Sequence, residues 1–374
     1  MNKPIIRSRS ITVDNKPIRI LMLIPEEKNC GITTYAHYLL MQLQPLGGLQ
    51  VEIAINHAQN RLAEYALLAS ELEKNTNIIH VQFEFARFGK LFISGVGTPF
   101  FYRALSGRTI VVTTLHELPP KDKLFVRLAQ CFFLSFILDK SHHIIVHTAE
   151  SARQLHESHP QYAHKIIVIP HGMLEFNLET KKKNLPIEWK DKKIIGAFGF
   201  PAPHKHFESV IEAIAALPEE YVAVMGVGAQ TQAHEIYLAR LQQYAKELHV
   251  AHRVIWNGFV EEQKMAEFFS WLDVVIFPYS HVTESGALAL ALAHRKAVIA
   301  RDLPTFREIA DKHHCIQLFS TQEELAALIH WIVENPRERK QLIANIDGIL
   351  AARNWKTIAE QHKKLYVKLA GSEH

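Results

Sequence analysis

The feature that most constrains the fold of this chain is a regular alternation of short apolar runs with helical stretches. Polar segments of helical spacing, such as residues 150–157 (ESARQLHE), separate the apolar runs. Alternating strands and helices are typical of a parallel sheet that helices cover on both faces. The first half of the chain therefore predicts an α/β domain. Its apolar runs of strand length are residues 18–24, 51–55, 78–83, 109–116, 143–147 and 165–172.

The same pattern begins again after residues 174–193, a polar and charged stretch without apolar periodicity that is typical of a linker. The chain has 374 residues, which is more than one hydrophobic core usually supports. The sequence therefore predicts an α/β fold of two Rossmann-like domains and a final helix that packs across both. The predicted boundaries are 1–180, 181–353 and 354–374, and the later strands are expected within 193–200, 221–228, 253–260, 273–279 and 296–300.

Composition narrows the class of protein. Hydrophobic residues make up 48% of the chain and charged residues 21%, which is ordinary for a globular protein. No apolar run reaches the roughly 18 residues needed to cross a bilayer, and the first residues show no secretory signal. Three distant cysteines, Cys30, Cys131 and Cys315, indicate reduced thiols rather than a disulfide framework. We expect a cytoplasmic protein, and peripheral contact with the inner face of the membrane stays open.

Two features bear on partners. The net charge is +4 and the basic residues are dispersed, which does not favour nucleic acid but allows an anionic substrate or membrane surface. The stretch 123–140 is strongly apolar and edged by basic residues, so it suits docking at a membrane interface. Burial in the core explains the same helix, and we favour burial. The sequence does not indicate an oligomeric state.

A Ser-Gly pair follows the apolar strand 273–277. A turn of this kind presents backbone N–H groups beside the positive end of a helix dipole, which suits a diphosphate. Gly286 carries no side chain to block that approach, and the alanines that start with Ala287 let the helix pack closely. The alternative is an ordinary buried helix in which Ser285 is only the cap.

Seven segments, in this order, resemble the GT-B-fold retaining glycosyltransferases of family 4, the glycosyl transferases group 1. The resemblance implies two Rossmann-like domains that face a central cleft, with a C-terminal helix crossing back to the first domain. It also implies hexose transfer from a nucleotide-sugar, UDP- or GDP-linked, to a saccharide or lipid-linked acceptor in bacterial polysaccharide or glycoconjugate synthesis. The donor is a substrate, and no cofactor or metal is implied. The segments are CGITTYAHYLL, VQFEFARFG, VVTTLHELPP, IIVIPHGM, FGFPAPHKHFESVIEAI, WNGFVEEQKMAEFFSWLDVVIFPY and SGALALALAHRKAVIARDLPTFREI.

The resemblance assigns the nucleotide-sugar to the second domain. Lys205 is implied to neutralise the donor diphosphate, although Phe200 stands where the family has an arginine. Glu284 is implied to contact the ribose or the sugar, because the second glutamate of the family is absent here; a surface role for Glu284 is equally open. The implied nucleotide-sugar-binding residues are Gly199, Lys205, Gly258, Phe259, Glu284, Ser285, Gly286, Ala287 and Glu308.

In the first domain the resemblance points to residues that follow predicted strands. His116 is implied to contact the donor sugar or the reacting groups, and it is also placed on the acceptor side. His116, Lys205 and Glu284 form the predicted catalytic set. Glu117 follows His116 in the sequence and is placed on the acceptor side with it. Glu84 either binds the acceptor or caps the loop in which it lies. Gly31 lies in the first strand-to-helix loop, where an acceptor or phosphate is expected. Cys30 takes the place of a second glycine in that loop.

Two other functions stay open. The missing glutamate, arginine and glycine suggest a catalytically silent relative that serves as partner or stabilising subunit of another transferase. The other hypothesis is a Rossmann enzyme or epimerase. Against it, residues 225–231 (MGVGAQT) match the dinucleotide-binding fingerprint poorly, because Thr231 stands in place of its third glycine. His143 and His147 fit a core or surface strand better than a zinc site.

Overall fold

The computed structural model describes residues 17–26, 31–58, 61–90, 92–119, 124–176 and 184–371. The chain divides into two compact units, the first made of Met1–Gly172 with Trp355–His374 and the second of Met173–Asn354. The boundary predicted at 180/181 falls among residues 177–183, which lie outside the described residues. Each unit is described by itself.

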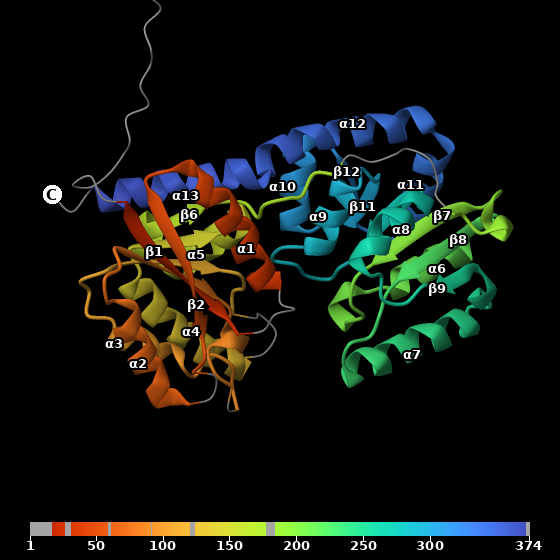
Figure 1. The fold of residues 1–374 in the computed structure, drawn as a ribbon. Helices are drawn as coiled ribbons and strands as arrows, with labels where there is room; N and C mark the ends of the chain where they lie inside the picture. The colour runs from red at the N-terminus through yellow and green to blue at the C-terminus, as the bar shows by residue number, and fades with distance from the viewer. Residues whose placement is uncertain are drawn as a thin grey trace, which may run out of the picture. The chain divides into compact units, whose positions relative to one another are not determined.

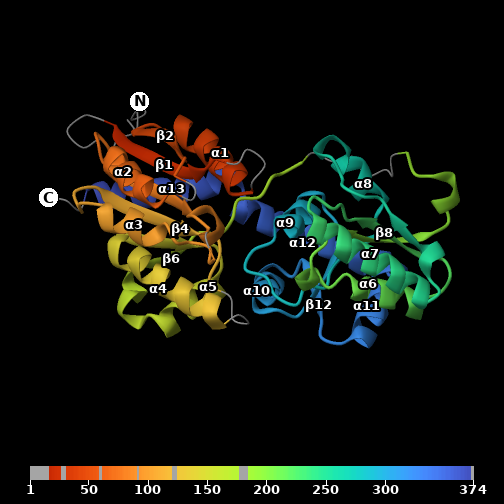
Figure 2. The same ribbon diagram turned by 90° about the horizontal axis from the view of Figure 1, so that it is seen from below.

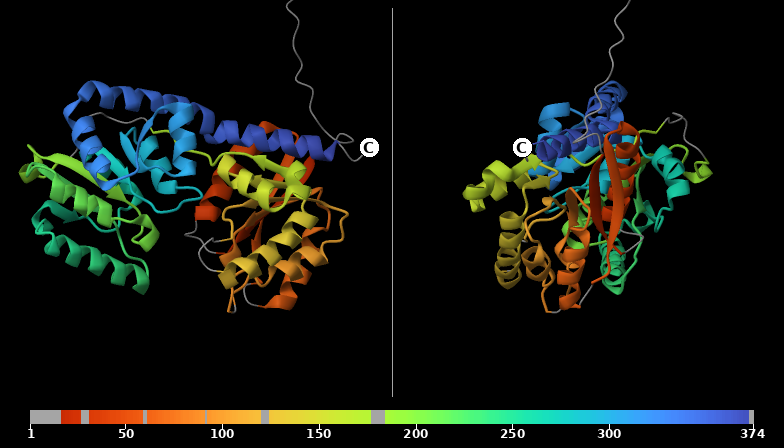
Figure 3. Two further views of the ribbon diagram at one scale, coloured as in Figure 1. Left: turned by 180° about the vertical axis from the view of Figure 1, so that it is seen from behind. Right: turned by 60° about the vertical axis from the view of Figure 1, so that its left-hand side comes forward.

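The first unit is built on a six-stranded parallel sheet with the order β2-β1-β3-β4-β5-β6. Helix α13 lies on one side of this sheet and α4 on the other (Figures 1 and 3). From β1 the chain goes to β2 on one side and then to β3 on the other, so β1 and β3 flank the point where the strand order reverses. The strands are β1 Ile18–Pro25, β2 Leu49–Asn56, β3 Ile78–Phe83, β4 Ile110–Leu115, β5 His143–Val146 and β6 Ile166–Val168. The helices are α1 Gly31–Leu43, α2 Leu62–Leu72, α3 Thr98–Ala104, α4 Leu124–Lys140, α5 Ala149–Ser158 and α13 Trp355–Ala370.

The second unit repeats this plan with the strand order β12-β11-β10-β7-β8-β9, all parallel. Here β7 and β10 flank the reversal, and ligands of open α/β sheets usually bind outside the carboxyl ends of such a pair. The strands are β7 Lys193–Phe198, β8 Tyr221–Gly226, β9 Val254–Trp256, β10 Val274–Phe277, β11 Val298–Arg301 and β12 Ile316–Phe319. The helices are α6 Glu208–Ala216, α7 Gln232–Glu247, α8 Met265–Trp271, α9 Gly286–Ala293, α10 Pro304–His313, α11 Gln322–Glu334 and α12 Pro336–Arg353.

The predicted fold class is confirmed: two parallel sheets with flanking helices form two Rossmann-like units. The central strands explain why. Every residue of β3 and of β4 is buried, as expected for strands that helices cover on both faces. The C-terminal helix α13 belongs to the first unit, where Trp355 packs edge-on against Tyr35 of α1 at 5.2 Å between ring centres.

Helix α4 departs from the burial that we favoured. Its sheet-facing side is buried as expected, through Leu134, Ile137 and Leu138. Its first three turns, however, expose a row of apolar side chains, so the prediction of burial is wrong for that part. Figure 2 shows α4 beside α3, in the layer that also holds α2. No helix among the described residues is long and apolar enough to cross a membrane. The exposed residues of α4 are Leu124, Phe125, Leu128 and Phe132.

Candidate functional site

The predicted residues of the second unit gather at one edge of its sheet. Carboxyl ends of parallel strands meet at the same edge, and each predicted residue follows one of those ends. Gly199 and Lys205 follow β7, Gly258 and Phe259 follow β9, the segment 284–287 follows β10, and Glu308 lies on α10 after β11. Two of these groups come from the strands that flank the reversal of strand order.

Lys205 lies over an aromatic ring at this edge. Its Nζ is 3.8 Å from the centre of the Tyr279 ring, in cation–π geometry. Burial lowers the pKa of Lys205 to about 8. The carbonyl of His204 accepts a bond from the N–H of Ser280 at 2.9 Å, which ties the loop after β7 to the loop after β10. The ammonium group is therefore held in place and partly stripped of water, as an anion-binding cation should be.

Ser285 is the N-cap of α9. Its hydroxyl accepts a hydrogen bond from the N–H of Leu288 at 3.2 Å, and the residue is 6% exposed. A side chain added at Gly286 would meet no atom within 4 Å, so the space in front of the helix is open. An added Cβ on Gly199, whose φ is +129°, would lie 3.9 Å from the Cβ of Ala287. The structure thus brings Gly199 beside the start of α9, where the predicted diphosphate site lies.

Glu284 is a mostly buried acid beside an arginine that the sequence did not suggest. The side chains of Glu284 and Arg353 are 19% and 8% exposed, and Oε1 lies 4.0 Å from Nη1 of Arg353. Burial raises the pKa of Glu284 to about 7, against the attraction of Arg353, and the nearby Glu308 adds to the rise. Oε2 of Glu284 has no hydrogen-bond partner in the part of the chain that is described. Because a buried polar atom without a partner is costly, this oxygen is a candidate acceptor for a ligand hydroxyl.

The Glu284 environment predicts a pH-dependent stability. Because the folded pKa of about 7 exceeds the ordinary glutamate value of 4.5, the fold loses stability as the pH rises from about 4.5 to about 7. Glu284→Gln removes the ionisation, so we expect the variant to be more stable than the parent near pH 8 by about 1 to 3 kcal/mol, and similar near pH 5. Urea unfolding at both pH values measures the difference.

The exposed Glu262, on the short helix Glu262–Lys264, offers the matched control, since Glu262→Gln should change stability little at either pH. Glu117 also titrates near neutrality, but it contributes equally to parent and variant. Equal stability of parent and Glu284→Gln at pH 8 contradicts the burial of this carboxyl.

An exposed aromatic surface occupies the position where the family has an arginine. Phe200 is 43% exposed and its ring is nearly parallel to that of Phe259, at 14° and 6.2 Å between centres. Phe200 also stacks on His234 at 12° and 5.8 Å between ring centres. Position 200, where the resemblance implies an arginine, therefore presents a flat apolar face next to the loop of Gly258 and Phe259.

The glycines of residues 225–231 have packing roles. A Cβ on Gly228 would lie 2.4 Å from the backbone N and Cα of Phe259, and one on Gly226 would lie 2.6 Å from the ring of Phe268. Both glycines let β8 and its loop approach neighbouring segments. This accounts for them without a dinucleotide, in line with the sequence argument.

Gly228→Ala is therefore expected to destabilise the second unit by about 1 to 3 kcal/mol, the usual cost of overpacking, because backbone atoms cannot yield as a flexible side chain can. Chemical unfolding measures the change. Gly348→Ala in α12 is the matched control, since its Cβ would meet only Nδ1 of His313 at 3.8 Å and alanine favours a helix. A Gly228→Ala protein as stable as the parent contradicts the close approach.

In the first unit His116 sits in a group of aromatic rings at the end of β4. Its Nε2 lies 2.9 Å from Oε1 of Gln82. Since that oxygen only accepts, Nε2 carries the proton and Nδ1 of the neutral ring keeps its lone pair. Burial lowers the pKa of His116 well below its usual value, and His147 and His171 add to the effect. His116 is therefore neutral at pH 7.

The two acids near His116 make structural contacts. Oε1 of Glu117 accepts the N–H of Phe85 at 2.7 Å, and burial followed by repulsion from Glu84 raises the pKa of Glu117 to about 7. Glu84 pairs with Arg87 at 3.2 Å, and its side chain makes no capping hydrogen bond to the short helix Phe85–Arg87 that follows it. Gly31 is the first residue of α1, with no atom within 4 Å of an added Cβ.

Some residues of the candidate site were missed by the sequence reasoning. Gln82 orients His116, and the Tyr35 ring packs edge-on against it at 5.1 Å. In the second unit, Tyr279 holds Lys205 and Arg353 faces Glu284. The sequence did contain a signal for Gln82 and Tyr279, because each lies at the carboxyl end of a predicted strand. For Arg353 the sequence contained no such signal.

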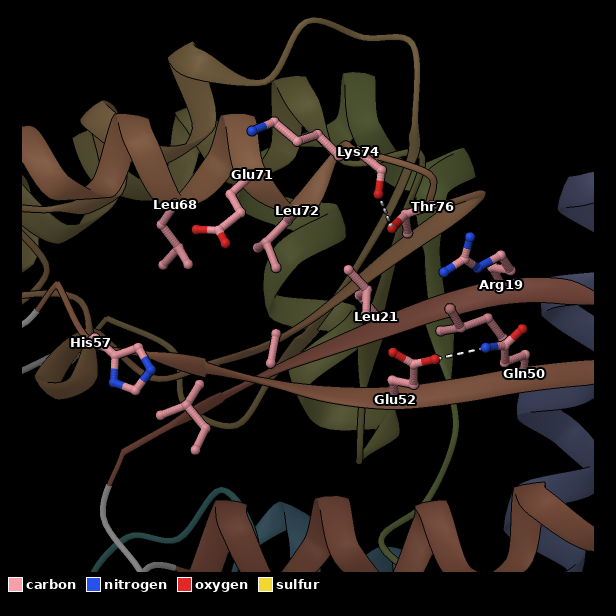
Figure 4. A pocket seen from close by; sticks show the side chains of 13 residues that line it. Arg19, Leu21, Gln50, Glu52, His57, Leu68, Glu71, Leu72, Lys74 and Thr76 are labelled. Carbon is pink, nitrogen blue, oxygen red and sulfur yellow. Dashed lines mark hydrogen bonds between the residues drawn. The ribbon is translucent and has the colours of Figure 1, made fainter.

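Two further observations concern ligands. Among the described residues, no group of three or more His, Cys, Asp or Glu side chains is placed to hold a metal ion. A groove of 370 Å³ runs between β2 and α2 in the first unit and contains none of the predicted site residues. Its lining mixes polar and apolar side chains, and Gln50 donates to Glu52 at 2.7 Å (Figure 4).

Two parallel α/β units with polar residues at the carboxyl edges of their sheets match the architecture of the GT-B proteins. Residues 179–347 match the family model described as Glycosyl transferases group 1. This match confirms, for residues 179–347, the resemblance to the glycosyl transferases group 1 that the sequence suggested. No curated protein matches the chain.

Solved structures share the fold of the whole chain. Sucrose-phosphate synthase from Thermosynechococcus elongatus has a TM-score of 0.76 at 16% identity, covering 95% of this chain and 100% of that one. Anabaena HepE in complex with UDP has a TM-score of 0.72 at 18% identity, covering 93% and 99%. A glycosyltransferase from Rickettsia africae has a TM-score of 0.71 at 15% identity, covering 95% and 99%. At these identities the likeness concerns the fold.

Proposed function

We propose that this chain is a retaining hexosyltransferase of family 4 that moves a hexose from a nucleotide-sugar to a saccharide or lipid-linked acceptor in polysaccharide or glycoconjugate synthesis. The observation that carries the proposal is the family match over the second unit, together with Lys205 and the Ser285–Gly286 turn at the reversal of its strand order. The proposal places the reaction in the cytoplasm, with UDP- or GDP-sugar as donor.

In this proposal the second unit binds the nucleotide. Lys205 neutralises the diphosphate as it departs, and the first N–H groups of α9 bind its oxygens beside Gly199. Oε2 of Glu284 accepts a hydroxyl of the ribose or the sugar, with Glu308 close to it. Gly258 and Phe259 complete the nucleotide pocket.

The first unit binds the acceptor and supplies His116, whose Nδ1 accepts a hydrogen bond from the sugar. Gly31, Glu84 and Glu117 belong to the acceptor side. The resemblance to retaining enzymes implies substitution on the same face of the sugar, with the departing phosphate as the base. No covalent nucleophile enters this proposal.

A thermal-shift screen of nucleoside diphosphates and their sugars tests the proposal, because a ligand that binds the native state raises the melting temperature. UDP-glucose is the first donor to try, since HepE was solved with UDP-glucose. A concentration-dependent rise, with slow hydrolysis of the same nucleotide-sugar in the absence of acceptor, supports the transferase. Binding without hydrolysis or transfer supports the silent-partner reading, and a rise with nicotinamide dinucleotides supports the Rossmann-enzyme reading.

We also expect transfer to persist in excess EDTA, since Lys205 and the start of α9 provide the positive charge that the diphosphate requires. Initial rates with and without chelator, on protein dialysed beforehand, measure this. Loss of transfer that magnesium or manganese restores refutes metal independence and leaves the rest of the proposal standing.

A further inference from the structure

Two polar residues interrupt the otherwise apolar central strand β3. His80 and Gln82 lie two positions apart, so both side chains point to the same face of the sheet, and they are 0% and 1% exposed. Thr114 of β4 is paired with Gln82 in the register of the two strands and therefore lies on that face as well. Buried polar groups need hydrogen-bond partners. These residues find their partners in one connected network.

The network begins on the C-terminal helix α13. The hydroxyl of Tyr366 lies 2.6 Å from Nδ1 of His80. Nε2 of His80 lies 2.8 Å from Oγ1 of Thr114 and 3.2 Å from the amide Nε2 of Gln82. Oε1 of the same amide lies 2.9 Å from Nε2 of His116. Side chains of α13 and β3 thus connect the C-terminal helix to the proposed sugar contact. We call Tyr366, His80, Gln82 and His116 the His80 network.

Each hydrogen bond of the His80 network limits where its neighbours carry a proton. Burial lowers the pKa of His80 and that of His116 well below the ordinary value, so both rings are neutral at pH 7, each with one N–H and one lone pair. The amide nitrogen of Gln82 only donates, so Nε2 of His80 supplies its lone pair. Nδ1 of His80 then carries the proton and donates it to the Tyr366 oxygen. The Thr114 hydroxyl donates to the same Nε2.

The proton of His116 is fixed by the other end of the same amide. The oxygen of Gln82 only accepts, so Nε2 of His116 carries the proton and Nδ1 keeps its lone pair. An amide turned by 180° would reverse both rings, since it would offer its oxygen to His80 and its nitrogen to His116. The tautomers of the two histidines are therefore coupled through Gln82.

We infer that His80 and Tyr366 are positioning residues, which act through Gln82 to hold His116 in the tautomer that accepts a hydrogen bond from the sugar. The inference rests on the proposed role of His116, whereas the tautomers themselves can be measured without a substrate. The Tyr366 oxygen is the acceptor for Nδ1 of His80. Without that oxygen the His80 proton is better placed on Nε2, where Thr114 accepts it, because a buried donor without a partner is costly. Gln82 then turns, and the His116 proton moves to Nδ1.

Nitrogen NMR of the histidine rings, in the full chain labelled with ¹⁵N-histidine, tests the inference. We expect the proton of His80 on Nδ1 and that of His116 on Nε2, with the signals assigned from His80→Gln and His116→Ala proteins. In Tyr366→Phe, which removes one oxygen, the His116 proton should move to Nδ1. The kcat of transfer should then fall about tenfold or more, because the ring presents a donor in place of an acceptor. Affinity for the nucleoside diphosphate found by thermal shift should stay near that of the parent.

Tyr102→Phe is the matched control. Tyr102 of α3 is also 0% exposed, and its hydroxyl lies 2.9 Å from Oγ1 of Thr113, on the opposite face of β4 from Thr114. This variant loses the same atom against the same sheet, so it should keep the His116 tautomer and the kcat of the parent even if its melting temperature falls.

Two results overturn the inference: a parent protein with the His80 proton on Nε2, or a Tyr366→Phe protein whose His116 ring is unchanged. A His116 proton that moves in Tyr366→Phe while transfer stays at the parent rate confirms the coupling and overturns the proposed sugar contact of His116. The NMR signals therefore distinguish a failure of the His80 network from a failure of the proposed reaction.

Discussion

Lys205→Ala is expected to lower kcat/KM by about 30- to 1000-fold, or about 2 to 4 kcal/mol of transition-state stabilisation, the scale of one preorganised charge contact. The ammonium group sits 3.8 Å over the Tyr279 ring, and no ion pair of Lys205 is found among the described residues. Its contact within the fold is the cation–π pair with Tyr279. Steady-state kinetics with a nucleotide-sugar found by the thermal-shift screen measure the loss.

The pKa of Lys205 adds a second signature. With a pKa of about 8 in the free protein, Lys205 loses its charge as the pH rises through that value. Affinity for a nucleoside diphosphate should therefore fall between about pH 7 and about pH 9 in the parent, and this part of the pH dependence should vanish in Lys205→Ala. Lys264→Ala, an exposed lysine of the same unit, is the control. Normal turnover in a folded Lys205→Ala protein removes Lys205 from the proposed site.

The strands were predictable because central strands of a parallel sheet are apolar throughout. The run 78–83 coincides with β3, every residue of which is buried. The strand β12, Ile316–Phe319, was missed because it lies at the edge of its sheet and is only half buried, with a polar Gln317 in its middle. Helix α12 was missed because its first half is charged, although Leu342, Ile346, Ile349 and Leu350 have helical spacing.

The candidate site was predictable only in part. Lys205, Ser285 and Gly286 were found because chain position alone puts them at strand ends and a helix start. Their partners were not, because Tyr279 and Arg353 reach Lys205 and Glu284 from distant parts of the chain. Such pairs depend on how β7, β10 and α12 are arranged. The exposed face of α4 was misread for the same reason, since apolar content does not say which side of a helix a sheet will cover.

His116→Ala is expected to lower kcat by roughly 10² or more while affinity for a bare nucleoside diphosphate stays near that of the parent. The proposed nucleotide contacts lie in the second unit, and His116 belongs to the first. Its ring is neutral and is oriented by Gln82, which leaves Nδ1 to accept a sugar hydroxyl. Kinetics of transfer and calorimetry of nucleotide binding separate the two effects.

His143→Ala is the matched control for this prediction, because His143 lies at the start of β5, away from the carboxyl edge, where Nδ1 contacts the carbonyl of Lys165 at 3.0 Å. It should retain transfer. If His116→Ala loses nucleotide affinity together with melting temperature, His116 is a structural residue of the ring group that includes Tyr35 and His147. If neither transfer nor affinity changes, the reaction does not use the end of β4, and the silent-partner reading gains. Only a fall in transfer with intact nucleotide binding assigns both units to one reaction.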